Sequence, residues 1–204
     1  MIKVNVNASR NYDICIADGI LNSCAELISG VKKDACKAAV ISDDRVFPLY
    51  GDKVISELKE REFEVFTYIF ENGEKSKTLE TYCGIQGFLA QSKLTRTDII
   101  VALGGGVVGD VAGFCAATFL RGIEYVQIPT SLLAAVDSSV GGKTAVDMPE
   151  GKNLVGAFHQ PSLVVCDTKC FDTLDQRQFA SGFAEVIKYG VLCDNELFEN
   201  LKKG

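Results

Sequence analysis

The sequence contains a single histidine, His159, among 204 residues. One histidine excludes a histidine triad, a histidine pair or a histidine-rich metal site built within this chain. No apolar run approaches the roughly 20 residues that a membrane-spanning helix needs. The first residues, MIKVNVNASRNYDI, alternate apolar and polar side chains where a signal peptide would have an apolar core. We therefore expect a cytoplasmic protein with no membrane partner.

Acidic residues outnumber basic ones, and the cysteines lack the close spacing of a C-x-x-C motif. The chain has 21 Lys and Arg against 27 Asp and Glu, whereas broad nucleic-acid or anionic-membrane binding favours a basic face. We expect no nucleic-acid partner, and an anionic ligand would need a local cluster of cations. The eight cysteines are scattered and form no C-x-x-C pair. Buried, reduced thiols are therefore favoured over a disulfide scaffold.

Segments of strand and helix character alternate along the chain. A length of 204 residues allows one full domain, or one domain and part of a second. The alternation predicts βαβ crossovers, and so an α/β fold with a mostly parallel, Rossmann-like sheet covered by helices on both faces. The expected strands are 2–6, 12–17, 37–42, 64–70, 98–103, 124–129 and 162–167, and the expected helices are 19–29, 46–60, 78–91 and 107–119.

Two segments depart from this alternation. Residues 136–161 are rich in glycine and show little periodicity, which predicts a long functional loop. From about residue 175 the pattern is helical only. We therefore expect an α/β domain over 1–174 and the beginning of an all-helical domain over 175–204.

A glycine-rich turn follows the expected strand 98–103. The segment GGGVVGD at 104–110 contains G-x-G-x-x-G before a helix. Glycines let the backbone approach a diphosphate, which amide groups at a helix N-terminus bind. However, the motif follows a late strand, and the next strand ends at Ile128 and Pro129 without an acidic residue. The pattern indicates either a nucleotide site of a different design or a tight turn without a ligand.

Charged residues follow another expected strand. Glu74 and Lys77, in ENGEKSK, come after the strand that ends at Phe70. Ligands bind at the carboxyl ends of parallel strands, so this acid and base could reach ribose hydroxyls. By themselves they equally indicate a solvated, charged loop.

Segment 136–161 places cations among small polar residues of an acidic protein. Such a cluster suits a phosphate or a carboxylate, although each lysine alone fits an ordinary surface. Asp137 follows the apolar residues LLAAV and must be paired, either by a structural partner or by a ligand. His159 is either a proton shuttle or a loop histidine with satisfied hydrogen bonds. The members of the cluster are Asp137, Lys143, Lys152 and Asn153, with Arg121 just before it.

A further charged pair lies in SGFAEVIKYG. Glu185 and Lys188 are three residues apart on an otherwise apolar helix face. A surface ion pair is the ordinary interpretation. The apolar neighbours favour a second interpretation, in which Glu185 or Lys188, or both, face a cleft.

Four segments, in this order and spacing, resemble the 3-dehydroquinate synthase family: GGGVVGDVAGF, QIPTSLLAAVDSSVGGKTAVD, GKNLVGAFHQP and FASGFAEVIKYG. The resemblance runs from about residue 40 onward and is most specific over 98–190. Related sugar-phosphate cyclases share much of this pattern. Glycerol dehydrogenases share the fold but not the GGKT and GKN segments.

The resemblance implies an activity and its cofactors. Members of the family have an NAD-binding α/β domain and a helical domain that supplies most of a metal site. They convert 3-deoxy-D-arabino-heptulosonate 7-phosphate to 3-dehydroquinate and phosphate, in the shikimate pathway of aromatic amino acid biosynthesis. The reaction is a transient NAD-dependent oxidation, phosphate elimination, re-reduction and intramolecular aldol closure, and zinc or cobalt acts as the Lewis acid. The resemblance thus implies an NAD- and metal-dependent carbon–oxygen lyase with a small sugar-phosphate substrate, and it leaves a homodimer open.

The resemblance also assigns residues. Those implied to bind NAD are Asp43, Glu74, Lys77, Gly105, Gly106, Val107, Val108, Gly109, Asp110, Thr130, Ser131, Lys143, Lys152 and Thr173. Those implied to act on the substrate are Asp137, Lys143, Lys152, Asn153 and Lys188, with Arg121 a candidate for the phosphate. Glu185 matches a metal ligand, and the family's two histidine ligands would lie beyond residue 204. Asp175 replaces a usual proline and Ser131 a frequent threonine.

Three hypotheses follow. The chain is the N-terminal part of a dehydroquinate synthase with an incomplete active site, a non-catalytic NAD-binding module, or part of a sister cyclase for another sugar phosphate. A protein that only binds a nucleotide does not need a cluster that binds substrate anions. Such a cluster is formed here by Lys143, Lys152 and Asn153, together with Glu185. This argument disfavours the second hypothesis.

Overall fold

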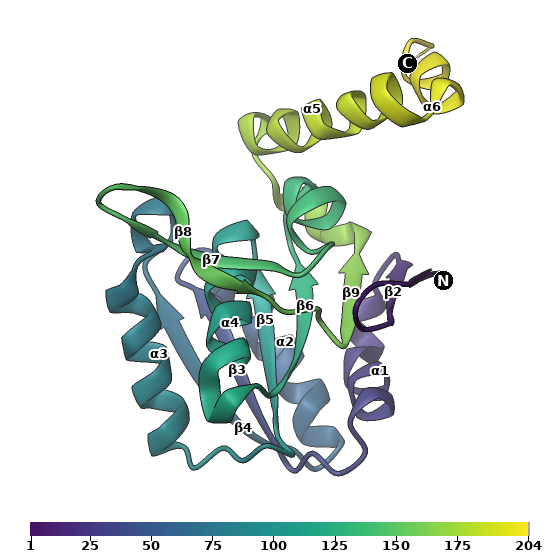
Figure 1. The fold of residues 1–204 in the computed structure, drawn as a ribbon. Coiled ribbons are helices and arrows are strands. Elements are labelled where there is room, and N and C mark those ends of the chain that lie inside the picture. The colour runs from purple at the N-terminus through teal and green to yellow at the C-terminus, as the bar shows by residue number, and fades with distance from the viewer. Residues whose placement is uncertain (204) are drawn as a thin grey trace.

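A seven-stranded sheet forms the centre of the computed structural model, which describes residues 1–203 (Figure 1). The strand order is β1-β2-β9-β6-β5-β3-β4. Only β1 and β2 pair in an antiparallel manner among the pairs of this sheet in the described chain, and the other neighbours are parallel. The strands are β1 (Ile2–Val6), β2 (Tyr12–Ala17), β3 (Lys37–Asp43), β4 (Glu64–Phe70), β5 (Ile99–Gly104), β6 (Glu124–Pro129) and β9 (Leu163–Asp167). The expected mostly parallel α/β fold is confirmed.

Helices cover both faces of this sheet, as the alternation predicts. On one face lie α1 (Cys24–Val31) and α2 (Phe47–Glu60), and on the other lie α3 (Leu79–Gln91) and α4 (Gly106–Thr118). Successive side chains of a strand point to opposite faces. Accordingly, Val101 of β5 packs in the core that contains Leu58 of α2, and Ala102 packs in the core that contains Ile85 of α3. These two apolar layers fix the sheet between its helices.

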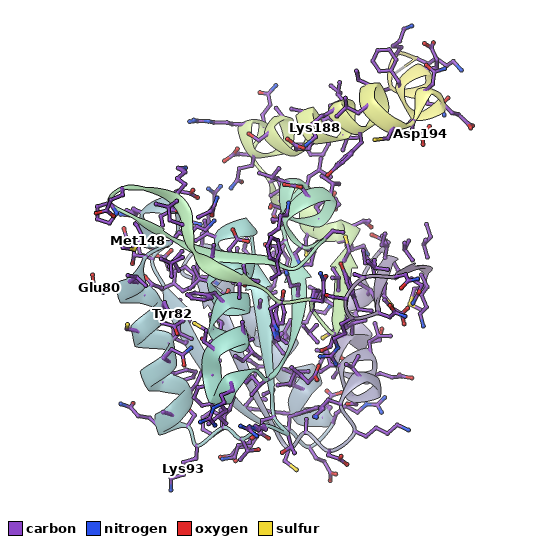
Figure 2. The ribbon with its side chains drawn as sticks, in the orientation of Figure 1. Glu80, Tyr82, Lys93, Met148, Lys188 and Asp194 are labelled. Carbon is purple, nitrogen blue, oxygen red and sulfur yellow. The ribbon has the colours of Figure 1, made fainter. Side chains whose placement is uncertain are left out.

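The expected long loop at 136–161 is wrong. This segment begins with the last residues of a π-helical turn, η4 (Ala134–Ser138), and continues as a two-stranded hairpin of β7 (Lys143–Met148) and β8 (Gly151–Phe158). The hairpin crosses α4, and Val146 is buried in the apolar core that contains residues of α3 and α4. Its tip carries Met148 beside the start of α3 (Figure 2). The strand period is hard to read because β8 exposes Leu154 and Phe158 to solvent.

The C-terminal helices stand apart from the sheet (Figure 1). A 3₁₀ segment, η5 (Thr168–Thr173), leads to α5 (Gln176–Cys193) and α6 (Asn195–Leu201). The side chain of Asp175 caps α5 by accepting from the Gln178 amide. The expected boundary near 175 thus coincides with the start of α5, and a separate helical domain stays a prediction. Within residues 1–203, no helix is both long and apolar enough to cross a membrane.

The cysteines give a first testable prediction. All eight are free thiols, and Cys15, Cys24, Cys115, Cys166 and Cys170 are buried. Burial raises the pKa of the Cys24 thiol to about 12, so that residue carries almost no reactive thiolate at pH 8. We expect a thiol-reactive dye at pH 8 to label only the exposed Cys36, Cys83 and Cys193 rapidly. Mass spectrometry of the labelled protein identifies the modified cysteines. Rapid labelling of a buried cysteine in the folded protein would contradict this assignment.

Candidate active site

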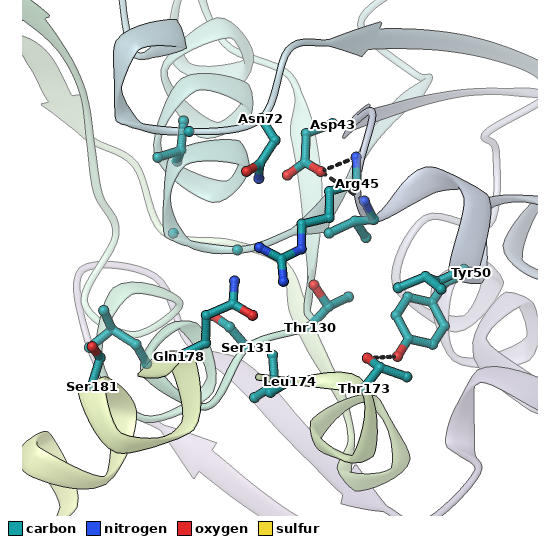
Figure 3. A pocket seen from close by; sticks show the side chains of 17 residues that line it. Asp43, Arg45, Tyr50, Asn72, Thr130, Ser131, Thr173, Leu174, Gln178 and Ser181 are labelled. Atoms are coloured by element: carbon teal, nitrogen blue, oxygen red, sulfur yellow. Dashed lines mark hydrogen bonds between the residues drawn. The ribbon is translucent and has the colours of Figure 1, made fainter. Parts of the chain in front are cut away.

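A cavity of about 280 Å³ lies where several parallel strands end. Asp43 is the last residue of β3, Gly105 directly follows β5, and Thr130 directly follows β6. All three line the cavity together with Thr173, which follows β9 through η5 (Figure 3). The carboxyl ends of parallel strands form the ligand-binding crevice of open α/β sheets. The fold therefore brings these four predicted site residues to one place, hereafter the first cavity.

Asp43 presents a buried carboxylate to the first cavity. Its Oδ1 accepts hydrogen bonds from the backbone amides of Arg45, at 3.0 Å, and Val46, at 2.8 Å. These bonds hold the turn into α2 and fix the side chain, which is shown in Figure 3. A carboxylate has about four lone-pair sites, so Asp43 keeps the capacity to accept from the hydroxyl groups of a ligand.

Two contacts beside the first cavity join the region around the start of α2 to the segment after β9. The hydroxyl groups of Tyr50 and Thr173 are 2.6 Å apart, and Nη2 of Arg45 is 3.1 Å from Oδ2 of Asp175 (Figure 3 shows the first contact). The amide of Gln178 and the Arg45 guanidinium together hold the pKa of Asp175 below its ordinary value. The departure from proline at 175 thus provides a helix cap and an ion-pair partner.

The glycine-rich turn forms the floor of the first cavity. Gly105 is the N-cap of α4, and within residues 1–203 no side chain caps this helix. The first amide groups of a helix have no intrahelical acceptor and carry partial positive charge. Gly105, Gly106 and Val107 line the cavity. Helix amides without acceptors can bind a phosphate group, and a carboxylate beside them can accept from sugar hydroxyl groups, so the first cavity has groups suited to a dinucleotide.

The rest of the motif has a packing role. Val108 is fully buried against the sheet. A Cβ on Gly109 would come 2.7 Å from Oε1 of Gln127, so a side chain here would have to displace the buried Gln127 amide, which donates to the Tyr125 hydroxyl. The structure therefore places Val108 and Gly109 behind the cavity wall.

A second cavity of about 460 Å³ lies between the hairpin and the start of α4. It is lined by Asp110, Asp137, Lys143 and Asn153. Nζ of Lys143 is 3.1 Å from Oδ1 of Asp137, and the hydroxyl of Tyr189 donates to the same oxygen at 3.4 Å. The expected partner of Asp137 is therefore a pair of structural contacts, one of which reaches from α5.

Lys77 lies in a buried ion pair instead of a solvated loop. Its side chain is 6% exposed, and Nζ lies 2.5 Å from Oδ2 of Asp110 and 2.5 Å from Oδ1 of Asn153. Burial raises the pKa of Asp110, and the Lys77 ammonium opposes that rise. Lys77 thus joins the segment before α3 to the second turn of α4, through Asp110, and to the hairpin, through Asn153.

Glu74 and Lys152 form a more exposed contact beside it. Nζ of Lys152 is 2.8 Å from Oε1 of Glu74, and this hydrogen bond raises the pKa of Lys152. Neither residue lines the first or the second cavity. Their pairing holds the hairpin against the segment before α3.

Glu185 and Lys188 form an ion pair on α5, and the hydrogen bond to Glu185 raises the pKa of Lys188 (Figure 2 labels Lys188). Tyr189, the next residue, contacts Asp137, so this part of α5 lies near the second cavity. Among residues 1–203, no three His, Cys, Asp or Glu side chains are grouped as metal ligands would be. Glu185 offers one ligand, and the donor set of these residues does not complete a metal site.

Two predicted residues lie elsewhere. Arg121 is exposed and lies between the end of α4 and the start of β6. It is therefore at the amino ends of the parallel strands, whereas the first cavity lies at their carboxyl ends. Nε2 of His159 is 3.0 Å from the carbonyl oxygen of Ile123, and its ring stacks on Tyr125. Of the two interpretations of His159, the structure supports the loop histidine with satisfied hydrogen bonds. Within one copy of the chain, neither residue joins the cluster.

Arg45, Ser138 and Tyr189 also lie at or beside the two cavities and are not among the residues predicted from the sequence. Arg45 lies two residues beyond the carboxyl end of β3, so the rule that ligands bind at the carboxyl ends of parallel strands would have found it. Ser138 and Tyr189 adjoin selected residues, but nothing in the pattern distinguishes them from their neighbours. Their positions depend on η4 and on the docking of α5.

Comparison with known proteins agrees with this geometry. A family model described as "3-dehydroquinate synthase N-terminal" matches residues 67–181. The 3-dehydroquinate synthase of Prochlorococcus marinus (strain MIT 9312) is 50% identical over 196 residues, which cover 95% of this chain and 54% of that protein. The chain thus spans about half the length of the curated relatives it matches.

Solved structures of related cyclases share the fold. A 2-deoxy-scyllo-inosose synthase complexed with carbaglucose-6-phosphate, NAD+ and Co2+ superimposes with a TM-score of 0.88 at 31% identity, covering 96% of this chain and 53% of that one. ValA, a 2-epi-5-epi-valiolone synthase from Streptomyces hygroscopicus with NAD+ and Zn2+ bound, gives a TM-score of 0.85 at 28% identity, covering 98% and 55%. From its sequence, its fold and the family match, the chain belongs to the 3-dehydroquinate synthase family.

Proposed function

We propose that the chain is the NAD-binding part of a 3-dehydroquinate synthase. The whole enzyme would convert 3-deoxy-D-arabino-heptulosonate 7-phosphate to 3-dehydroquinate and phosphate. The observation that carries the proposal is the placement of Asp43 and the open N-terminus of α4 in one cavity, next to the cluster around Lys143. The first cavity suits a dinucleotide, and the second suits an anionic substrate beside it.

In this proposal the first cavity binds the adenosine and diphosphate portions of NAD. Asp43 accepts from the ribose hydroxyls, and the amides of Gly106 and Val107 donate to the diphosphate. Thr130, Ser131 and Thr173 line the same cavity and offer further hydroxyl groups. Bound NAD would supply the hydride acceptor for the transient oxidation.

The second cavity would bind the nicotinamide end and the substrate. Lys143 and Asn153 line it, and Lys152 and Lys188 lie on the hairpin and on α5 around it. Lysines bind phosphate and carboxylate as point charges. Asp137 orients Lys143 through their ion pair. We propose that Glu185 supplies one metal ligand; its ion pair with Lys188 would have to open for it to do so.

The finer substrate assignment rests on the curated relatives. The relative at 50% identity is a 3-dehydroquinate synthase, whereas the structural neighbours at 31% and 28% are sister cyclases. The higher identity favours the heptulosonate phosphate over another sugar phosphate. We also propose a cytoplasmic location and no nucleic-acid partner, in keeping with the excess of 27 acidic over 21 basic residues.

Calorimetric titration of the 204-residue chain with NAD+ tests this proposal. We expect binding, and we expect D43N to weaken it about tenfold, because a ribose diol loses a charged acceptor while the amide oxygen of the substituted side chain can still cap the turn into α2. D52N, which alters an exposed carboxylate of α2, is the matched control and should leave the Kd unchanged. The same loss in both variants, or no NAD+ binding, would contradict the proposal.

Phosphate release provides a second readout. Residues 1–203 hold no group of three His, Cys, Asp or Glu side chains that could bind a metal ion, and Glu185 is the single ligand that we propose among them. We therefore expect no turnover of the heptulosonate phosphate by the chain with added zinc and NAD+. Substantial phosphate release would show that the described residues already complete the active site.

A further inference from the structure

The hydroxyl group of Ser138 is buried and has no hydrogen-bond partner within residues 1–203. Leaving a buried hydroxyl unpaired costs folding free energy, so most buried hydroxyl groups in native proteins have a partner. Ser138 is the last residue of the π-helical turn η4 (Ala134–Ser138). Single π-helical turns are rare in proteins, and those that occur are often found at functional sites. An unpaired hydroxyl on such a turn is a candidate to bind a ligand.

Ser138 packs directly against the first residue of α4. A Cβ built on Gly106 would lie 3.0 Å from Oγ of Ser138. The hydroxyl therefore adjoins the helix N-terminus, where the first amide groups also have no intrahelical acceptor. An unpaired hydroxyl and unpaired amides at one point together form a site for a strong acceptor such as a phosphate oxygen.

The contact between Gly106 and Ser138 is also the boundary between the two cavities. Gly106 lines the first cavity with Asp43 and Thr130, and Ser138 lines the second with Asp110 and Lys143. A molecule that occupied both cavities would pass close to this contact. For a dinucleotide whose adenosine lies at Asp43, the group passing here is the phosphate on the nicotinamide side.

We propose that Ser138 is a cofactor-binding residue that donates its hydroxyl hydrogen to the nicotinamide-side phosphate of NAD. This inference deepens the proposed function and rests on it. Its chemistry is a hydrogen bond to a charged acceptor, made by a side chain that the fold leaves without any other partner within residues 1–203. The π-helical turn positions the hydroxyl by adding a residue to the helical turn before the hairpin.

Fragments of the cofactor locate the contact. NAD+, ADP-ribose and ADP all contain a second phosphate, and AMP does not. We expect S138A to weaken binding of the first three ligands about tenfold by calorimetry, the loss of one charge-assisted hydrogen bond, and to leave the Kd for AMP unchanged. Without ligand, S138A should not lower the Tm, because the alanine removes an unpaired group.

Ser139 offers a matched control. It is the next residue, is fully buried, and its hydroxyl already donates to the carbonyl oxygen of Ala135 at 3.4 Å. S139A should leave all four Kd values within about twofold and should lower the Tm. A structural role for Ser138 would instead lower the Tm of S138A and leave NAD+ binding intact.

The outcomes separate this proposal from the one it rests on. If the unmodified chain binds NAD+ and S138A binds it equally well, the role of Ser138 is overturned and the proposed function stands. If S138A weakens AMP as much as NAD+, the hydroxyl does not act at the second phosphate and the proposal is likewise overturned. If the unmodified chain binds neither NAD+ nor ADP-ribose, both proposals fail.

Discussion

Replacing Lys77 with methionine is expected to lower the free energy of unfolding by about 3–5 kcal/mol at pH 7, because it leaves a buried carboxylate unpaired. The side chain of Lys77 is 6% exposed and that of Asp110 is 18% exposed, so water can replace the ammonium group only in part. Asn153 loses the same donor. Urea unfolding of the chain without ligand measures the change.

Two further measurements attribute the loss to the charge. In K77M/D110N the buried charge is gone, so we expect most of the stability to return. In K77M the folded-state pKa of Asp110 is raised further above its unfolded value, because burial is no longer opposed. A raised carboxyl pKa disfavours folding above that pKa, so the deficit of K77M should shrink as the pH falls from 7 toward 5. A deficit below about 1 kcal/mol at pH 7, small for a buried ion pair, would contradict the assignment.

Replacing Gly182 with alanine is expected to detach α5 from the sheet domain. A Cβ at this position would come 2.5 Å from the backbone nitrogen of Leu133 and 2.7 Å from Cβ of Leu132, and these atoms cannot move aside like the end of a flexible side chain. Overpacking of this kind costs roughly 1–3 kcal/mol. Hydrogen exchange in 176–193 should accelerate about 10- to 100-fold, while β5 keeps its protection. The contact of Tyr189 with Asp137 should be lost with it.

Gly87 provides the control for this change. It lies in α3, and a Cβ there would meet nothing within 4 Å. G87A should therefore raise stability by about 0.5–1 kcal/mol, the usual gain from alanine in a helix, and should leave the exchange of α5 unchanged. Unchanged protection of α5 in G182A would show that its docking does not depend on the close approach at Gly182.

The alternation of strands and helices was predictable because burial on both faces leaves a local signal. Near-continuous apolar runs such as DIIVAL marked parallel strands, and β5 spans Ile99–Gly104 as expected within a residue. The resemblance selected Asp43 and the glycine motif selected Gly105, and the structure brings both to one cavity because each lies at the carboxyl end of a parallel strand. The hairpin was missed because β8 lies over α4 with exposed apolar residues, and its period is therefore weak.

The sequence by itself determined the α/β class, the strand ends that carry Asp43 and Thr130, and the resemblance that the family match confirms. Those features depend on local patterns and on residue identity along the chain. Only the tertiary structure decided that Lys77 is buried against Asp110, that Arg121 lies at the amino ends of the strands, away from the cavities, and that Ser138 faces Gly106. The physical reason is that burial and pairing of a polar group depend on segments distant in sequence, whose approach is set by packing of the whole fold.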